Sequence, residues 1–384
     1  MAAGLSTVAL VNMLVDPLSV CAPVSLAGLL PYRNFRYRTP KAERMLSKDW
    51  QTVILGTSRS EVSINSENPA WGAGPVFNGS LSGANFYEME AMFQLALHSR
   101  SLKRVVLFAD FELFGSPLGP AYDFKNSRLN SQWDPFHYYL VNLLGMGVST
   151  ETARTIILAC EGRPASVTPL GNDRPRTGRM DHRRAVAASL RRFFAAHPAK
   201  KQYERHAPEV LEGFRGIAHT CRERGIELII VLPPFHAVQL EALKLAGLWP
   251  ATEDARKGTL GVLTEEAKEA GAPPFALWDF TDYSPYVAEA FPTDDPQRPT
   301  RWFLENVHFT RELGDLIIER IVRGEEPDSD HGDGFGVRLT PGNLDRQLDQ
   351  LRQREYAYAA SHPQEIEFVR SIAAESGWVS HERD

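Results

Sequence analysis

Hydrophobic residues along the chain gather in short continuous runs that predict the buried strands of a parallel sheet. Such runs occupy residues 52–55, 104–110, 226–232 and 275–280. The two clearest read RVVLFAD and IELIIVLPP, and neither shows the alternation of apolar and polar residues that marks a strand with one solvated face. We therefore expect a sheet that is covered on both faces.

Helical patterns lie between these runs. Residues 84–99 and 311–323 carry apolar side chains at the spacing of one helical face. Strands that alternate with helices predict an α/β fold with right-handed crossovers. We expect three layers, with a central, mainly parallel sheet and helices on both of its faces.

Changes in composition divide the chain into three segments. Residues 1–49 hold an apolar N-terminal stretch and a basic lead-in, and residues 50–323 hold the α/β domain. Within this domain, residues 160–206 are rich in Arg, Pro and Gly, which predicts an insertion with a basic helix over the core or its entrance. Residues 324–384 predict an acidic linker followed by a helical C-terminal extension.

The first 15 residues carry no charged side chain, and Asp16-Pro17 ends this apolar run. A membrane-spanning helix needs roughly 20 apolar residues, so the segment alone is short for one. Two interpretations remain open: the end of a membrane anchor, which we favour slightly, or a buried N-terminal helix.

Composition excludes some classes of function. The 384 residues carry a formal net charge of −6, without the basic surplus of a typical nucleic-acid binder. The 3 cysteines are widely spaced and form neither a disulfide framework nor a metal-binding pattern. The sequence implies no metal and no cofactor.

Ser58 is the first candidate for chemistry. It follows the run at residues 52–55 in the stretch VILGTSRSEVS, at the edge of the sheet where open α/β folds bind ligands. The helix that follows offers backbone N–H groups for an oxyanion. The competing interpretation is a serine that caps this helix.

Glu305 and His308 are the partners that a serine nucleophile would need. They stand three residues apart before Thr310, which we expect to cap the helix at residues 311–323. A carboxylate there can hold one imidazole nitrogen as N–H and leave the other to accept the serine proton. The alternative for His308 is a core histidine.

A loop rich in glycine and asparagine, FNGSLSGANFYEME, supplies a third candidate element. Glycine permits close backbone approach, which suits an oxyanion donor. The candidates in this loop are Gly79, Gly83, Asn78 and Asn85.

Together these motifs resemble the SGNH/GDSL hydrolase superfamily over residues 50–323. GTSR at residues 56–59 resembles its first block, SLSGA its second, and Glu305-x-x-His308 its last. The resemblance implies a three-layer flavodoxin-like fold and a triad of Ser58, His308 and Glu305, with Gly83 as an oxyanion residue. The GTSR variant and the apolar N-terminus look most like membrane-anchored bacterial envelope members that add or remove acyl groups on polysaccharides.

The chain departs from the family pattern in three ways. Thr57 replaces an aspartate, and Glu305 stands where aspartate is usual. The third block's asparagine is missing after the strand at residues 104–110, where Asp110 and Glu112 offer only acceptors when ionised. Asn78 or Asn85 is the expected substitute donor, and LGND at residues 170–173 is a weaker alternative.

Two further residues have open roles. Arg59 would hold a substrate carboxylate or phosphate, or form a salt bridge with Asp110 or Glu112. His236 in LPPFHAV would line the pocket, although we favour a structural, hydrogen-bonded histidine. The stretch DSDHGDG lacks the spacing of a calcium loop and predicts a linker.

The function that the resemblance implies is a serine esterase or O-acyltransferase acting on an acylated envelope glycan or a similar ester. The expected location is the bacterial cell envelope, membrane-anchored or periplasmic, with attachment through the N-terminus; a cytoplasmic location stays open. The alternative is a catalytically weak or inactive envelope protein that binds glycan or a partner in a polymer-assembly or secretion complex.

Overall fold

The computed structural model describes residues 2–21, 24–120, 123–175, 180–196, 198–324 and 335–378. The chain forms two compact units. Unit 1 comprises Met1–Val105 and Leu118–Pro175, and unit 2 comprises Val106–Pro117 and Arg176–Asp384. The domain boundaries expected at residues 49 and 323 follow composition rather than compactness and stay predictions.

The described residues form a mostly parallel six-stranded sheet, which confirms the α/β class. The strands occur in the order β2-β1-β3-β4-β5-β6, and the division between the units falls within β3. In unit 1, β1 pairs with β2 in parallel. In unit 2, β4 and β5 are parallel, whereas β5 and β6 are antiparallel. The bounds are β1 Thr52–Leu55, β2 Val76–Asn78, β3 Arg104–Phe108, β4 Glu227–Leu232, β5 Ala276–Asp279 and β6 Val337–Leu339.

All four expected strands are present, and most of their apolar side chains are buried, although Ala276 of β5 is half-buried. β1 is buried at every position, as is β4 after its first residue. The sequence did not predict β2 and β6, because each has only three residues and gives no periodic signal.

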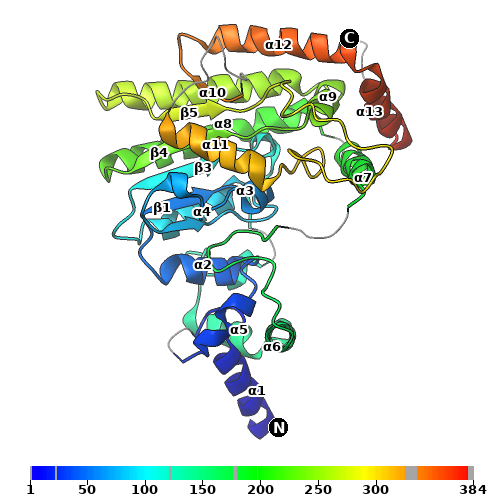
Figure 1. Ribbon diagram of the computed structural model, residues 1–384. Coiled ribbons are helices and arrows are strands. Elements are labelled where there is room, and N and C mark those ends of the chain that lie inside the picture. The colour runs from blue at the N-terminus through cyan, green and yellow to red at the C-terminus, as the bar shows by residue number, and fades with distance from the viewer. Residues whose placement is uncertain are drawn as a thin grey trace. The chain divides into compact units, whose positions relative to one another are not determined.

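The helices of unit 1 fall into two groups (Figure 1). α2 and α4 lie near β1, and α4 packs against this strand. α1, α5 and α6 pack against one another. The bounds are α1 Ala2–Val15, α2 Arg38–Leu46, α3 Ser58–Ser63, α4 Phe86–Ala96, α5 Pro135–Leu144 and α6 Met146–Cys160.

The helices of unit 2 include one that the sequence predicted to the residue, at 311–323. A long amphipathic helix, α8, packs against β4 and α10 and buries its apolar face there. At the C-terminus, α12 and α13 follow one another (Figure 1). The bounds are α7 His182–Ala195, α8 Lys200–Glu223, α9 Ala237–Leu245, α10 Trp249–Glu269, α11 Arg311–Arg323, α12 Leu344–Ser361 and α13 Pro363–Glu375.

The segment at residues 160–206 holds more regular structure than its composition predicts. The expected basic helix is α7, and residues 200–206 already belong to α8. The boundary between the units also falls within the segment, after Pro175. The acidic linker expected after residue 324 lies outside the described residues up to residue 334.

The N-terminal apolar stretch forms α1, and its assignment as the end of a membrane anchor stays a prediction. None of the helices among the described residues is long and apolar enough to cross a membrane. The expectation of a buried helix is wrong for its outward side, where Leu10 is 50% exposed.

Glu241 on α9 makes the stability of unit 2 depend on pH. Burial raises the pKa of its carboxyl to about 7, against the opposing hydrogen bond from the Tyr283 hydroxyl at 2.9 Å. A raised pKa favours the folded state at low pH, so this contribution is complete below the unfolded pKa near 4.5 and is lost as pH rises through 7.

Replacing Glu241 by glutamine is therefore expected to raise the free energy of unfolding at pH 8 by roughly 2–3 kcal/mol, because the amide carries no charge to bury. At pH 4.5 the effect is expected to be small. Urea denaturation at both pH values measures the difference. An equal effect at the two pH values would contradict this account.

Candidate active site

Ser58 begins a short helix directly after β1. Gly56 and Thr57 make the turn, and Thr57, not Ser58, is the N-cap: its hydroxyl accepts from the Arg59 N–H at 3.4 Å. Ser58 is half-buried at the first helical position. The capping role considered for Ser58 therefore belongs to its neighbour.

A buried ion pair fixes the helix that carries Ser58. Lys41 Nζ on α2 lies 2.6 Å from Glu61 Oε1 on α3, and both side chains are fully buried. Lys41 also donates to the Ser80 carbonyl, and the Ser82 hydroxyl donates to the other oxygen of Glu61. The carboxylate thus links α2, α3 and the glycine-rich loop.

Burial lowers the pKa of Lys41, whereas the Glu61 carboxylate opposes that shift by favouring the ammonium form. Neither residue was singled out from the sequence, since they stand 20 positions apart. A lysine and a glutamate at such a separation give no signal of their own.

Asn78 is committed to the backbone around Ser58. Its amide nitrogen donates to the carbonyls of Ser60 at 2.9 Å and Ile64 at 3.0 Å, and its oxygen accepts from the Ser80 N–H. Both amide hydrogens are therefore used. In this arrangement Asn78 supports the turn and has no hydrogen left for an oxyanion.

The rest of the loop retains its candidate residues in different settings. Gly83 has a φ of +65°, a left-handed conformation that favours glycine, and a side chain there would meet nothing within 4 Å. Asn85 is the N-cap of α4: its oxygen accepts from the Glu88 N–H, and its amide donates to the Gly119 carbonyl at 2.6 Å. Gly79 packs tightly against Met45 and Met92.

The LGND stretch lies beside the Ser58 turn within unit 1. Gly171 has a φ of +84°, and a Cβ there would come within 1.9 Å of the Asn78 carbonyl oxygen. The side chain of Asn172 exchanges hydrogen bonds with Ser66. LGND thus packs against and hydrogen-bonds the segments around the Ser58 turn. Its position in the sequence did not predict this role.

Glu305 and His308 meet in unit 2 within a tight loop. The loop is closed by the Phe303–Phe309 bridge and by the hydrogen bond from the Leu304 N–H to the His308 carbonyl. Within it, His308 Nδ1 is hydrogen-bonded to Glu305 Oε1. The predicted pairing of these two residues is present, as is the predicted Thr310 cap of α11.

The loop also sets the chemistry of the pair. Burial raises the pKa of the Glu305 carboxyl, but the contacts with His308 and the N–H groups of Val307 and His308 outweigh it and hold the pKa below its usual value. An ionised Glu305 accepts from Nδ1–H, so a neutral His308 carries its acceptor lone pair on Nε2. That is the form a general base requires.

His236 is a structural residue. It is the N-cap of α9, where Nδ1 accepts from the Val238 N–H, and Nε2 bonds the Glu289 carbonyl at 2.7 Å. Burial lowers the pKa of its ring to about 4. These contacts are those of a hydrogen-bonded structural histidine, the interpretation that we favoured. The backbone N–H of His236 also donates to the Asn306 carbonyl beside the Glu305–His308 pair.

Arg59 and Asp110 are both buried, Arg59 in unit 1 and Asp110 in unit 2. Asp110 follows β3 at the start of the short 3-10 helix η3, Phe111–Gly115. The roles expected for these two residues stay predictions.

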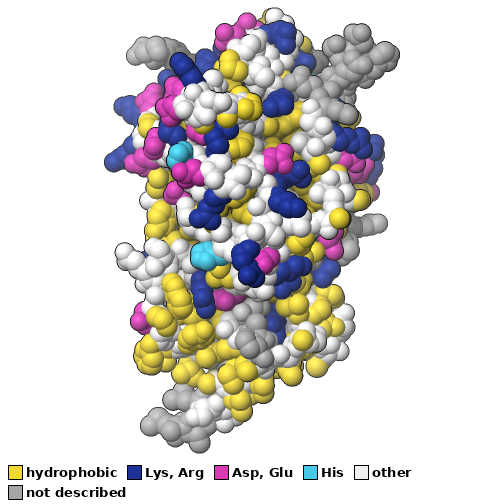
Figure 2. Space-filling view, turned by 90° about the vertical axis from the view of Figure 1, so that its left-hand side faces the viewer, with side chains coloured by type: hydrophobic (Ala, Val, Ile, Leu, Met, Phe, Trp, Pro, Cys, Tyr) yellow, Lys and Arg dark blue, Asp and Glu magenta, His cyan; other side chains and the backbone are white. Residues whose placement is uncertain are grey.

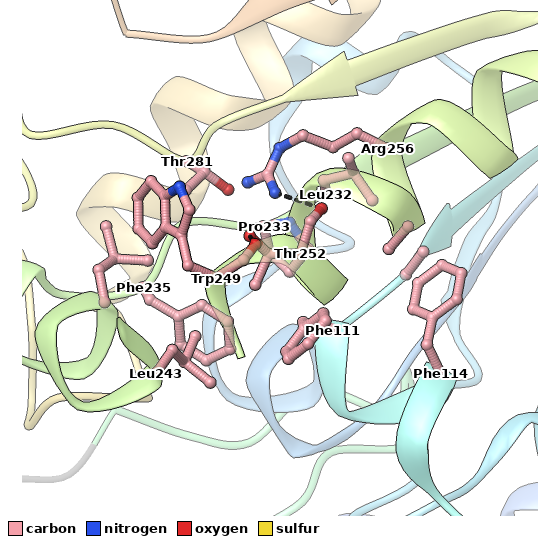
Figure 3. Close-up of a pocket in the computed structure, with 13 residues that line it drawn as sticks. Phe111, Phe114, Leu232, Pro233, Phe235, Leu243, Trp249, Thr252, Arg256 and Thr281 are labelled. Atoms are coloured by element: carbon pink, nitrogen blue, oxygen red, sulfur yellow. Dashed lines mark hydrogen bonds between the residues drawn. The ribbon is translucent and has the colours of Figure 1, made fainter. Parts of the chain in front are cut away.

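Unit 2 has an apolar pocket at the carboxyl ends of its strands (Figure 3). Aromatic side chains from η3, the loop after β4 and α10 point into it, with Arg256 at one side. Arg256 is held by Asp279 at 2.6 Å and by the Thr252 carbonyl at 2.6 Å. The cavity volume of about 30 Å³ suits a small group or a water molecule rather than a whole ligand.

The comparisons with known proteins identify no relative. The chain matches no family model, no curated protein and no solved structure. Among the described residues, no group of three or more His, Cys, Asp or Glu side chains is placed to hold a metal ion.

Proposed function

We propose that the protein is an SGNH-like serine esterase or O-acyltransferase. The observation that carries the proposal is the Glu305–His308 pair, in which an ionised carboxylate orients an imidazole at the entrance to α11. Ser58, at the carboxyl end of β1, is the proposed nucleophile. The strand order 2-1-3-4-5 is that of flavodoxin-like sheets, which supports this form of the fold.

The proposed reaction uses only groups of this chain. His308 Nε2 takes the proton of Ser58 as Oγ attacks the ester carbonyl, and the N–H groups of Ser58 and Gly83 stabilise the oxyanion. The alcohol leaves with the proton from His308. Water or a sugar hydroxyl then releases the acyl group by the reverse sequence. The reaction requires Ser58 Oγ and His308 to come within hydrogen-bond reach.

The oxyanion site is the weak part of the proposed machinery. Both amide hydrogens of Asn78 are engaged, and the Asn172 amide bonds Ser66. Losing one oxyanion donor costs about 3–4 kcal/mol of transition-state stabilisation, so we expect slow turnover. The same observation favours the second candidate, a non-catalytic envelope protein that binds glycan or a partner protein.

The proposed substrate is an acylated envelope glycan or similar ester, and the proposed location is the cell envelope. Both rest on the resemblance of the GTSR, SLSGA and Glu305-x-x-His308 motifs.

A fluorophosphonate probe tests the enzyme directly. We expect it to form an adduct that peptide mapping places on Ser58, because the probe reacts with activated serines. Replacing His308 by asparagine should slow labelling about a hundredfold or more, since general-base catalysis typically contributes at least about that factor.

The matched control replaces His98, an exposed histidine bonded only to carbonyls of its own helix end, by asparagine. This variant should label like the wild type. If folded protein forms no adduct on Ser58 at any pH, the esterase proposal is rejected. The non-catalytic binding protein then remains as the proposed function.

A further inference from the structure

Three helices of unit 1 present a cluster of large hydrophobic side chains to solvent. The most exposed are Met146, which is 90% exposed at the start of α6, and Phe136, which is 77% exposed on α5. Figure 2 shows hydrophobic side chains gathered over this part of unit 1. We name this the apolar surface; its members are Val8, Leu10, Val11, Leu14, Phe136, Tyr139, Leu140, Met146, Ile156 and Ile157.

The apolar surface carries little charge. Between residues 1 and 32 the sequence holds one charged residue, Asp16, and α5 holds none. α6 holds Glu151 and Arg154, which form an ion pair at 3.8 Å. Asp16 is fully buried, 3.6 Å from the guanidinium of Arg33, and therefore adds no charge to the surface. Monomeric soluble proteins rarely expose a contiguous apolar patch of this kind without a partner for it.

The helices beneath the surface are held in place by polar contacts. Asn12 of α1 is buried, and its amide donates to the Leu143 carbonyl of α5 at 2.7 Å. Its oxygen accepts from the Thr152 hydroxyl of α6, also at 2.7 Å. One side chain thus ties all three helices together, so the exposed residues belong to a defined platform.

Charge argues for a phospholipid bilayer as the occupant. Unit 1 contains 15 Lys and Arg against 12 Asp and Glu, whereas unit 2 contains 27 against 36. An anionic bilayer therefore attracts the unit that bears the apolar surface and repels the other. α1 exposes Val8, Leu10, Val11 and Leu14, and such apolar side chains suit burial in the interface between headgroups and acyl chains.

We propose that the apolar surface of α1, α5 and α6 binds unit 1 to the surface of an anionic phospholipid bilayer. Phe136 and Met146 insert most deeply, because they are the most exposed apolar side chains of the cluster. The proposal is independent of the proposed esterase activity and would hold for a non-catalytic protein as well.

Vesicle cosedimentation with the full chain tests it. Wild-type protein is expected to sediment with phosphatidylcholine vesicles that contain phosphatidylglycerol, and less with phosphatidylcholine alone. Replacing Phe136 and Met146 together by glutamate should weaken binding about a hundredfold, since each inserted side chain contributes at least about tenfold.

The matched control is Tyr356→Glu on α12, because Tyr356 is 76% exposed but lies outside the apolar surface. It should bind like the wild type. The Phe136/Met146 double variant and Tyr356→Glu should both keep the wild-type melting temperature, because the altered side chains are exposed. Absence of wild-type binding, or binding that survives the double substitution, would overturn the proposal. So would self-association without vesicles that the double substitution abolishes, which would make a second copy the occupant.

Discussion

Replacing Ser58 by alanine is expected to lower the hydrolysis of p-nitrophenyl acetate by about a thousandfold or more, to the rate of the surrounding solution. The hydroxyl is the only group at this position that can form the acyl-enzyme, so neither the Glu305–His308 pair nor the oxyanion donors can compensate for its loss. The change itself is small: Ser58 is half-buried at the first position of α3, where alanine is well tolerated.

The control for this prediction is Ser371→Ala on α13, an exposed serine whose hydroxyl bonds only the Phe368 carbonyl among the contacts of its helix. It should leave turnover unchanged. If Ser58→Ala keeps the wild-type rate while its melting temperature is also unchanged, Ser58 is not the nucleophile and the esterase proposal fails.

Replacing Lys41 by methionine is expected to destabilise the protein by roughly 3–5 kcal/mol, the largest stability effect that the described contacts predict. Methionine fills a similar volume but leaves the Glu61 carboxylate fully buried without its cation. The helix that carries Ser58 also loses its link to α2. Urea denaturation at pH 7 measures the effect.

A double variant distinguishes the destabilisation caused by the unpaired Glu61 charge from that caused by altered packing at residue 41. Lys41→Met combined with Glu61→Gln should recover part of the stability, because the amide carries no charge to bury. The matched control is Lys200→Met, which breaks an exposed pair with Glu204 and should cost no more than about 0.5 kcal/mol. Equal losses for Lys41→Met and Lys200→Met would show that the buried pair does not hold the turn.

Local patterns in the sequence predicted the parts of the fold that local physics decides. Continuous apolar runs predicted the four longer strands, because a strand that is buried on both faces needs apolar residues at successive positions. The helix at residues 311–323 followed from its apolar spacing and from Thr310, whose hydroxyl caps the Leu313 N–H. β2 and β6 were missed, since a strand of three residues forms only when a neighbouring strand is there to pair with it.

The candidate site also has features that local sequence predicts and features that depend on tertiary contacts. Glu305 and His308 were predicted together because they stand three positions apart and one turn joins them. Asn78 was expected to donate to a substrate, yet it bonds the carbonyls of Ser60 and Ile64. The type of an asparagine is visible in a sequence, whereas its hydrogen-bond partners depend on segments that fold against it.

The sequence by itself determined the α/β class, the strand ends that carry Ser58, and the pairing of Glu305 with His308. Each follows from interactions between residues close along the chain. Tertiary structure alone decided that Lys41 neutralises Glu61, that Gly171 lies against Asn78, and that α1, α5 and α6 share one exposed apolar surface. These contacts join residues that are 20 to more than 100 positions apart, and no periodicity in the chain records which distant segments will meet.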